Sequence, residues 1–172
     1  PVRKPRRLLD IGTGTGAWLM KAAADFPKCD CTGIDTVRAV PDSALPDNCT
    51  FIQMDLLRGT KFEDGLFDYI RQRALLPAIP LDRWTEHARE CFRLSRPGAL
   101  VEWIESDNLL RPSGPALDRL NTVLVATAAH LGWATDLVER LPEAMTTAGL
   151  RGVETRRVRV PVGDWSEDTA GR

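Results

Sequence analysis

The chain has 172 residues, of which 43% are hydrophobic and 27% are charged, and its formal net charge is −1. This length and composition fit one soluble globular domain with a substantial core. The nearly balanced charge gives no overall field that would favour nucleic acid or an anionic membrane, so neither is expected as a partner. The oligomeric state is left open.

The chain contains four cysteines, Cys29, Cys31, Cys49 and Cys91. No histidine stands at ligand spacing from them, so no metal site is expected. The sequence shows no signal peptide and no long apolar run, which favours a cytoplasmic protein with free thiols.

Short apolar runs alternate with helical patterns through the first hundred residues. This alternation predicts an α/β, Rossmann-like fold with a mainly parallel sheet and helices on both faces. Ligands bind such sheets beyond the carboxyl ends of the strands. The first helix is expected over residues 17–26, and the second over 81–94 with Asp82 as its N-cap. The expected strands cover residues 7–12, 31–35, 50–55, 67–72 and 99–104.

The second half predicts two more helices and a last strand. Apolar residues at helical spacing favour a helix over 113–131, with Leu117, Leu120 and Leu124 in register. A further helix over 137–148 contains Pro142, which predicts a break. A sixth strand is expected over 152–160, near an edge of the sheet because of its charges. Together these elements predict a single domain over 1–172, with a core at 6–107 and a C-terminal part at 113–162.

The stretch LLDIGTGTGAW, residues 8–18, places three glycines after an apolar strand that ends in Asp10. It can be interpreted as a dinucleotide fingerprint, with Asp35 as the acid that holds a ribose. However, a pyrophosphate would be repelled by a carboxylate at the end of the first strand. The same carboxylate suits S-adenosylmethionine, which carries an ammonium group and a sulfonium centre. The loop alone leaves the cofactor open, and Asp10 favours the second interpretation.

Two further acids support that interpretation. Asp35 ends the second strand and could accept hydrogen bonds from both ribose hydroxyls. Asp55 ends the third strand and could accept one from the adenine amino group, with Leu56 packed on the ring. All three acids are expected along one rim of one sheet, whereas a dinucleotide enzyme needs only the second of them.

The ordered set LLDIGTGTGAW, GIDT, FIQMDL, FDYIRQR and LSRPGALVEW resembles class I S-adenosylmethionine-dependent methyltransferases. The resemblance runs from about Arg7 to Val162. Within that class, GTGTGAW, FDYIRQRAL and RVPVGDW are similar to a group associated with secondary metabolism. Some members of that group act as regulators, and others methylate small molecules.

The resemblance implies a cofactor site at the carboxyl edge of the sheet. It implies that Arg71 pairs with the cofactor carboxylate, although a surface arginine is an equal interpretation. It also implies Asp35 at the ribose and Asp55 with Leu56 at the adenine. The residues implied around the methionine and ribose portions are Asp10, Gly12, Thr13, Gly14 and Gly16.

The implied activity is methyl transfer to a small-molecule acceptor. A general base matters only if the acceptor must lose a proton. Glu105 and Asp107 follow the fifth strand and are weak candidates for that base, because solvated loop carboxylates are the favoured interpretation of both. Trp133 and Trp165 lie outside the core pattern and are candidates for substrate contact.

Two other functions remain open at this point. The glycine loop also fits an NAD(P)-dependent oxidoreductase. A non-catalytic, methyltransferase-like regulatory protein is the third hypothesis, because elements of the family pattern are missing. The resemblance implies seven strands and often a helical cover at the N-terminus. This sequence begins a few residues before its first strand and ends in the polar DWSEDTAGR, so we expect a chain trimmed at both ends.

Overall fold

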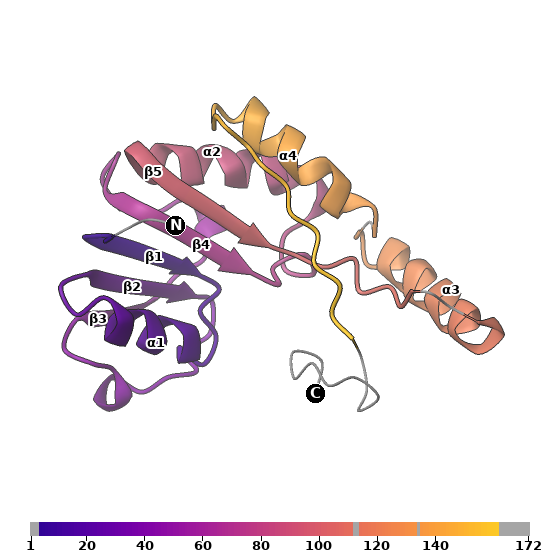
Figure 1. Cartoon of the computed structure of the whole chain (residues 1–172), viewed down its shortest axis with the longest axis horizontal. Helices are drawn as coiled ribbons and strands as arrows, with labels where there is room; N and C mark the ends of the chain where they lie inside the picture. The colour runs from indigo at the N-terminus through magenta and orange to yellow at the C-terminus, as the bar shows by residue number, and fades with distance from the viewer. Residues whose placement is uncertain (1–3, 112–113, 134, 162–172) are drawn as a thin grey trace.

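The computed structural model describes residues 4–111, 114–133 and 135–161 (Figure 1). Residues 113 and 162, which bound the expected C-terminal part, lie outside these ranges, and so does Trp165. The strands are β1 (Arg7–Ile11), β2 (Asp30–Asp35), β3 (Cys49–Gln53), β4 (Phe67–Arg73) and β5 (Ser95–Ile104). The helices are α1 (Ala17–Asp25), α2 (Trp84–Leu94), α3 (Pro115–His130) and α4 (Leu137–Thr147). Three short 3₁₀ turns are η1 (Asp42–Ala44), η2 (Leu56–Arg58) and η3 (Leu81–Arg83).

The five strands form one parallel sheet in the order β3-β2-β1-β4-β5. The chain runs outward from β1 to β3 and then returns to the other side of β1 with β4. The strand order therefore reverses between β1 and β4, and a crevice for ligands is expected at the carboxyl ends of these two strands. The expected mainly parallel, Rossmann-like sheet is confirmed.

Helices cover both faces of this sheet (Figure 1). On one face, Leu8 and Cys31 pack with Leu19 and Ala22 of α1. The opposite face is built from the residues that alternate with these, and α2 contributes two of its members. This second cluster contains Leu9, Ile11, Ile34, Leu56, Phe67, Ile70, Cys91 and Leu94. Every residue of β1 from Leu8 to Ile11 is buried, as a central parallel strand covered on both sides requires.

The expected strand over 152–160 does not form. Residues 153–161 belong to no helix or strand, and most of their side chains are exposed. A strand needs a neighbour for its backbone groups, and within the described ranges no strand pairs with the outer edge of β5. The charges at Glu154, Arg156 and Arg157 also leave this segment no apolar face to bury. The described residues thus contain five of the six expected strands.

The second helix begins later than expected. Residues Leu81–Arg83 form the turn η3, and α2 starts at Trp84 without a side-chain cap. The prediction of Asp82 as N-cap was therefore wrong: Pro80 and the 3₁₀ turn set the entry to the helix. In α2, Trp84 and Cys91 are buried, whereas Phe92 is 49% exposed.

The C-terminal helices also differ from the expectation. Helix α4 runs through Pro142 without a break and packs against α2. Helix α3 extends away from the sheet (Figure 1), and Ala128 is its one buried residue within the described ranges. Its apolar side chains at Leu120 and Val123 are 44% and 60% exposed. None of the described helices combines the length and the apolar character that crossing a membrane requires.

Helix α1 approaches β2 closely at Gly33. A Cβ at this position would lie 2.8 Å from Leu19 Cδ2 and 2.9 Å from Thr13 Cγ2. We therefore expect Gly33→Ala to lower the free energy of unfolding by about 2 kcal/mol, because the added methyl overpacks this contact. Chemical denaturation measures the loss. Gly114→Ala is the control, since nothing lies within 4 Å of its Cβ, and the poorer N-cap should cost only about 0.5 kcal/mol. Equal losses in both variants would contradict the close approach.

Candidate functional site

The glycine loop joins β1 to α1 and folds back over β2. Gly12, Gly14 and Gly16 have φ angles of +67°, +54° and +72°. These left-handed angles suit glycine and are strained for other residues. The backbone N–H groups of Gly12 and Thr13 both donate to the carbonyl of Ile34, at 2.9 and 3.1 Å. The loop is thereby held against the carboxyl end of β2.

Asp35 ends β2 and holds the middle of the same loop. Its Oδ2 accepts a hydrogen bond from the Gly14 N–H at 2.8 Å, and its Oδ1 accepts one from the Val37 N–H at 3.1 Å. The side chain is half-buried, so part of the carboxylate remains accessible. A Cβ on Gly14 would meet nothing within 4 Å. An acid and an open stretch of backbone therefore lie side by side at this edge.

Asp10 ends the neighbouring strand and is closed inside the protein, with 2% of its surface exposed. Its Oδ2 accepts a hydrogen bond from the Thr13 hydroxyl at 2.7 Å, and its Oδ1 pairs with an Arg71 guanidinium nitrogen at 3.2 Å. Burial raises the pKa of Asp10, although the hydrogen bond from Thr13 and the charge of Arg71 oppose this rise. The nearby charge of Asp35 raises it further. Both acids hold the same glycine loop, Asp10 through Thr13 and Asp35 through Gly14.

Arg71 lies in a row of charged side chains that crosses three strands. In the sheet register Asp10 pairs with Arg71, and Arg71 pairs with Glu102. The Arg71 guanidinium carbon lies 4.0 Å from the centre of the Trp18 ring, and its Nε lies 3.9 Å from Glu102 Oε2. Tyr69 donates its hydroxyl proton to the same Glu102 oxygen at 2.5 Å. Sequence reasoning missed Glu102 and Tyr69, because their place beside Arg71 depends on the strand register.

Asp55 forms its hydrogen bond and its ion pair within a turn of its own. It follows β3 by two residues and caps η2, where its Oδ1 accepts a hydrogen bond from the Leu57 N–H at 3.0 Å. Its other oxygen pairs with Arg58 at 3.2 Å. Leu56 is buried in the core rather than open at the surface. The structure thus brings Asp10 and Asp35 to one loop and gives Asp55 a separate turn.

A second polar group lies on the α2 face of the sheet. Gln72 and His87 are both buried, and a His87 ring nitrogen contacts Gln72 Oε1. Because that amide oxygen only accepts, we assign the proton to His87 Nε2. The ring stacks on Trp103 with centroids 5.1 Å apart. Burial lowers the pKa of His87 to about 4, so the ring is neutral at pH 7.

Both carboxylates that were candidate general bases hold loops in this structure. Glu105 accepts hydrogen bonds from Gln72 Nε2 at 3.2 Å and from the Leu75 and Leu76 N–H groups at 3.0 and 3.1 Å. Its burial raises its pKa. Asp107 accepts a hydrogen bond from the Leu109 N–H and pairs with Arg111 at 2.6 Å. A catalytic role for either stays a prediction.

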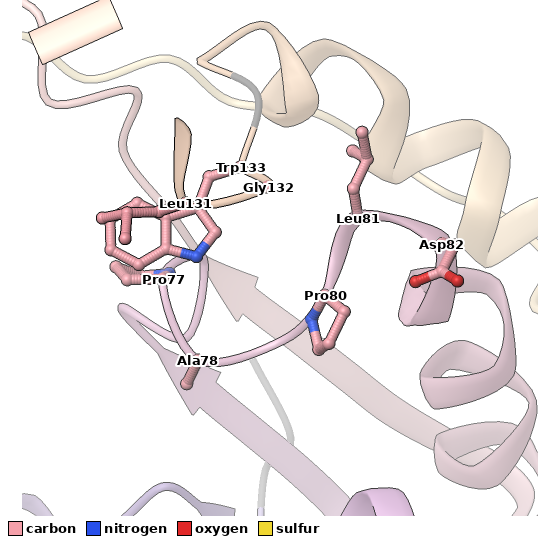
Figure 2. Close-up of a pocket in the computed structure, with 8 residues that line it drawn as sticks. All are labelled: Pro77, Ala78, Pro80, Leu81, Asp82, Leu131, Gly132 and Trp133. Atoms are coloured by element: carbon pink, nitrogen blue, oxygen red, sulfur yellow. The ribbon is translucent and has the colours of Figure 1, made fainter. Parts of the chain in front are cut away.

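A groove of about 400 Å³ lies between the loop that joins β4 to α2 and the turn that follows α3 (Figure 2). Leu131 and Trp133 stand on one side of it, and Pro80 and Leu81 on the other. Its lining is mostly apolar, and Asp82 is the one charged side chain among the described residues that line it. Trp133, a predicted substrate contact, is part of this wall. The lining residues are Pro77, Ala78, Pro80, Leu81, Asp82, Leu131, Gly132 and Trp133.

The described residues contain no group of three or more His, Cys, Asp or Glu side chains placed to hold a metal ion. All four cysteines are free thiols.

The doubly wound sheet, the glycine loop and the acids at the ends of β1 and β2 define a Rossmann-like domain for a nucleoside cofactor. The sequence pattern of the methyltransferase domain family matches residues 8–98, which is about half of the chain. The chain therefore belongs to the methyltransferase domain family. The resemblance to class I S-adenosylmethionine-dependent methyltransferases is confirmed.

Two fungal relatives are similar to this chain. It is 25% identical over 169 residues to Methyltransferase pytC of Aspergillus terreus, covering 95% of this chain and 51% of that protein. It is 37% identical over 103 residues to Secondary metabolism regulator laeA of Coprinopsis cinerea, covering 59% of this chain and 25% of that protein. The chain spans about half the length, or less, of these two relatives.

A solved structure confirms the fold. The Haemonchus contortus phosphoethanolamine N-methyltransferase 2, in complex with phosphomonomethylethanolamine and S-adenosylhomocysteine, superposes with a TM-score of 0.67. The match covers 90% of this chain and 35% of that one, at 20% identity.

The buried ion pair between Asp10 and Arg71 predicts strong coupling between the two residues. Asp10→Asn should lower the free energy of unfolding by about 3 kcal/mol, because it leaves a buried cation without its closest partner. The double variant Asp10→Asn/Arg71→Met should be more stable than the sum of the two single changes implies. Urea denaturation of the four proteins measures this coupling. Simple additivity would contradict the pairing.

The neutral, buried His87 predicts a loss of stability in acid. Its folded pKa of about 4 lies below the unfolded value near 6.5. The contribution of the neutral ring to the free energy of unfolding is therefore complete above pH 6.5 and is lost as the pH falls toward 4. From pH 7 to pH 5 this group alone should cost about 2 kcal/mol. Asp10 and Glu105 have raised pKa values and act in the opposite direction.

The comparison of wild type with His87→Gln isolates this contribution, since the amide does not titrate. Denaturation at pH 7 and at pH 5 should show a larger loss for the wild type than for the variant. Parallel losses in the two proteins would show that His87 is not buried as a neutral group.

Proposed function

We propose that the protein to which this chain belongs transfers a methyl group from S-adenosylmethionine to a small-molecule acceptor. The family membership supports methyl transfer. The observation that supports this cofactor is the glycine loop. The Ile34 carbonyl holds the start of the loop, and the Asp35 carboxylate holds its middle. The structural neighbour in complex with S-adenosylhomocysteine has the same fold.

Asp35 would bind the ribose of the cofactor. Its carboxylate lies at the end of β2 and is half-buried, with one oxygen already oriented by the Gly14 N–H. A charged acceptor forms stronger hydrogen bonds with hydroxyl donors than a neutral one does. The bare backbone of Gly14, beside this acid, lets a ligand approach without a side chain in the way. Gly12, Thr13 and Gly16 complete the loop around it.

Asp10 and Arg71 would bind the amino-acid end of the cofactor. The two side chains are buried and pair with each other at 3.2 Å. An ammonium group and a carboxylate on one carbon would complement their charges in place of this mutual pairing. Asp55 would contact the adenine from the turn after β3, as the resemblance implies, whereas Leu56 is part of the core beneath that turn. When bound, S-adenosylmethionine supplies a methyl group on a positively charged sulfur. The protein's contribution is alignment and the exclusion of water.

The acceptor would lie in the groove between the β4–α2 loop and the turn after α3. The mostly apolar lining and the indole of Trp133 favour an apolar small molecule. If the acceptor must lose a proton, Glu105 and Asp107 remain the predicted bases. A net charge of −1 supports a small molecule over nucleic acid. The cytoplasmic location and the single-domain organisation also stay predictions.

A second candidate function is regulation without catalysis. It is supported by the similarity to Secondary metabolism regulator laeA of Coprinopsis cinerea. The family match favours both functions over the NAD(P)-dependent oxidoreductase. Transfer of labelled methyl groups from S-adenosylmethionine into a metabolite extract separates the two. A labelled product supports the enzyme, whereas cofactor binding without any labelled product supports the regulator.

The proposed ribose contact predicts the effect of removing one charge. Asp35→Asn should weaken binding of S-adenosylhomocysteine roughly tenfold, because it loses charge-assisted hydrogen bonds. Isothermal titration calorimetry measures this affinity. Asp30→Asn is the matched control, since Asp30 is exposed at the opposite end of β2, and its affinity should equal that of the wild type. A wild-type protein that binds no S-adenosylhomocysteine would argue against the proposed function.

A further inference from the structure

The turn that follows β4 has an unusual backbone. Ala74 has a φ of +57°, in the left-handed region that is unfavourable for a residue with a Cβ. Such a conformation persists where the surrounding structure holds it in place. The Ala74 N–H donates to the carbonyl of Ile104 at 3.0 Å, so the end of β5 fixes the first residue of the turn.

Glu105 holds the next two residues of the turn. Its carboxylate accepts hydrogen bonds from the N–H groups of both Leu75 and Leu76. A third hydrogen bond comes from Gln72 Nε2, and Gln72 is in turn fixed by His87. Gln72 and His87 are 0% and 1% exposed. The carboxylate is thus anchored from the interior and presents its oxygens to the turn.

The side chain of Leu75 connects this turn to the glycine loop by direct contact. A Cβ placed on Gly12 would lie only 2.4 Å from Leu75 Cδ2, so the leucine lies directly against the first glycine of the loop. On its other side, Gly12 donates its N–H to the carbonyl of Ile34. The start of the loop is therefore confined between β2 and Leu75.

The same turn continues into one wall of the groove. Pro77 and Ala78 follow Leu76 directly, and they line the groove together with Pro80. The N–H groups of Ala78 and Ile79 both donate to the Leu75 carbonyl, at 2.9 and 3.1 Å. A displacement of Leu75 would therefore move the groove wall as well as the backing of the glycine loop.

We propose that Glu105 is a positioning residue that fixes the turn after β4 and, through Leu75, holds the glycine loop in its binding shape. This positioning role acts through the turn and is separate from the predicted role of Glu105 as a base. Only the claim that this loop shape binds the cofactor rests on the proposed function. The contacts that link Glu105 to the loop are present without a cofactor.

Amide hydrogen exchange in the absence of cofactor tests this link. Glu105→Gln replaces one acceptor oxygen by an NH₂ group that faces backbone donors, so exchange at Leu75 and Leu76 should accelerate at least tenfold. The N–H groups of Gly12 and Thr13 should accelerate by a similar factor, relative to the β1 amides that report global unfolding. Faster exchange at Leu75 and Leu76 alone would overturn the proposal, as would a uniform change across all these amides or no change at all.

Two further variants give the test its controls. Leu75→Ala keeps the Glu105 hydrogen bonds and removes the contact, so it should accelerate Gly12 and Thr13 while leaving the Leu76 amide unchanged. Glu90→Gln makes the same chemical change in another carboxylate, on α2. Glu90 accepts several hydrogen bonds, from Thr60 and Arg93. This variant should leave the exchange of the glycine loop as in the wild type, whatever it does to overall stability.

The affinity for S-adenosylhomocysteine is the second readout. Glu105→Gln and Leu75→Ala should bind it about tenfold more weakly than wild type, and Glu90→Gln should bind it equally well. Unchanged affinity in the first two variants would overturn the role in binding. If the wild type binds none, the proposed function fails, and the exchange rates still decide whether Glu105 holds the loop.

Discussion

The rest of the structure depends on the buried ion pair between Asp10 and Arg71. It joins β1 to β4, the two strands between which the order of the sheet reverses. Two charges removed from water require each other, since either one alone would be unpaired in the interior. Thr13 adds a hydrogen bond to the same carboxylate and so ties the glycine loop to this pair. The position of the loop and the register of the central strands are thereby set together.

The two faces of the sheet support the carboxyl edge in different ways. On the α1 face, the guanidinium of Arg71 is stacked on Trp18 and lies near Glu102. On the α2 face, the neutral pair of His87 and Gln72 orients Glu105. The α1 face thus places charged side chains beneath the glycine loop. The α2 face fixes the turn after β4, which packs against that loop through Leu75. These two buried polar groups, one on each face, therefore fix the loops at the carboxyl edge of the sheet.

The local signals of the sequence predicted most of the fold. Alternating apolar runs and helical spacing identified the five strands and both covering helices, because burial on two faces requires continuous apolar strands. The predictions failed where a neighbour decides the outcome. Residues 152–160 were expected to form a strand but have no partner in the described structure. The apolar side chains of α3 have helical spacing but little to cover them. Asp82 has the chemistry of a cap but not the backbone position.

The candidate site divides in the same way. The sequence by itself determined the glycine loop, the acids at the strand ends and the family, because these depend on residue type and spacing along the chain. The tertiary structure decided the partners: Arg71 for Asp10, Glu102 beside Arg71, and Glu105 for the turn after β4. The physical reason is that hydrogen bonds and ion pairs between strands depend on register and side-chain direction. Both arise only when segments distant in sequence pack into one sheet.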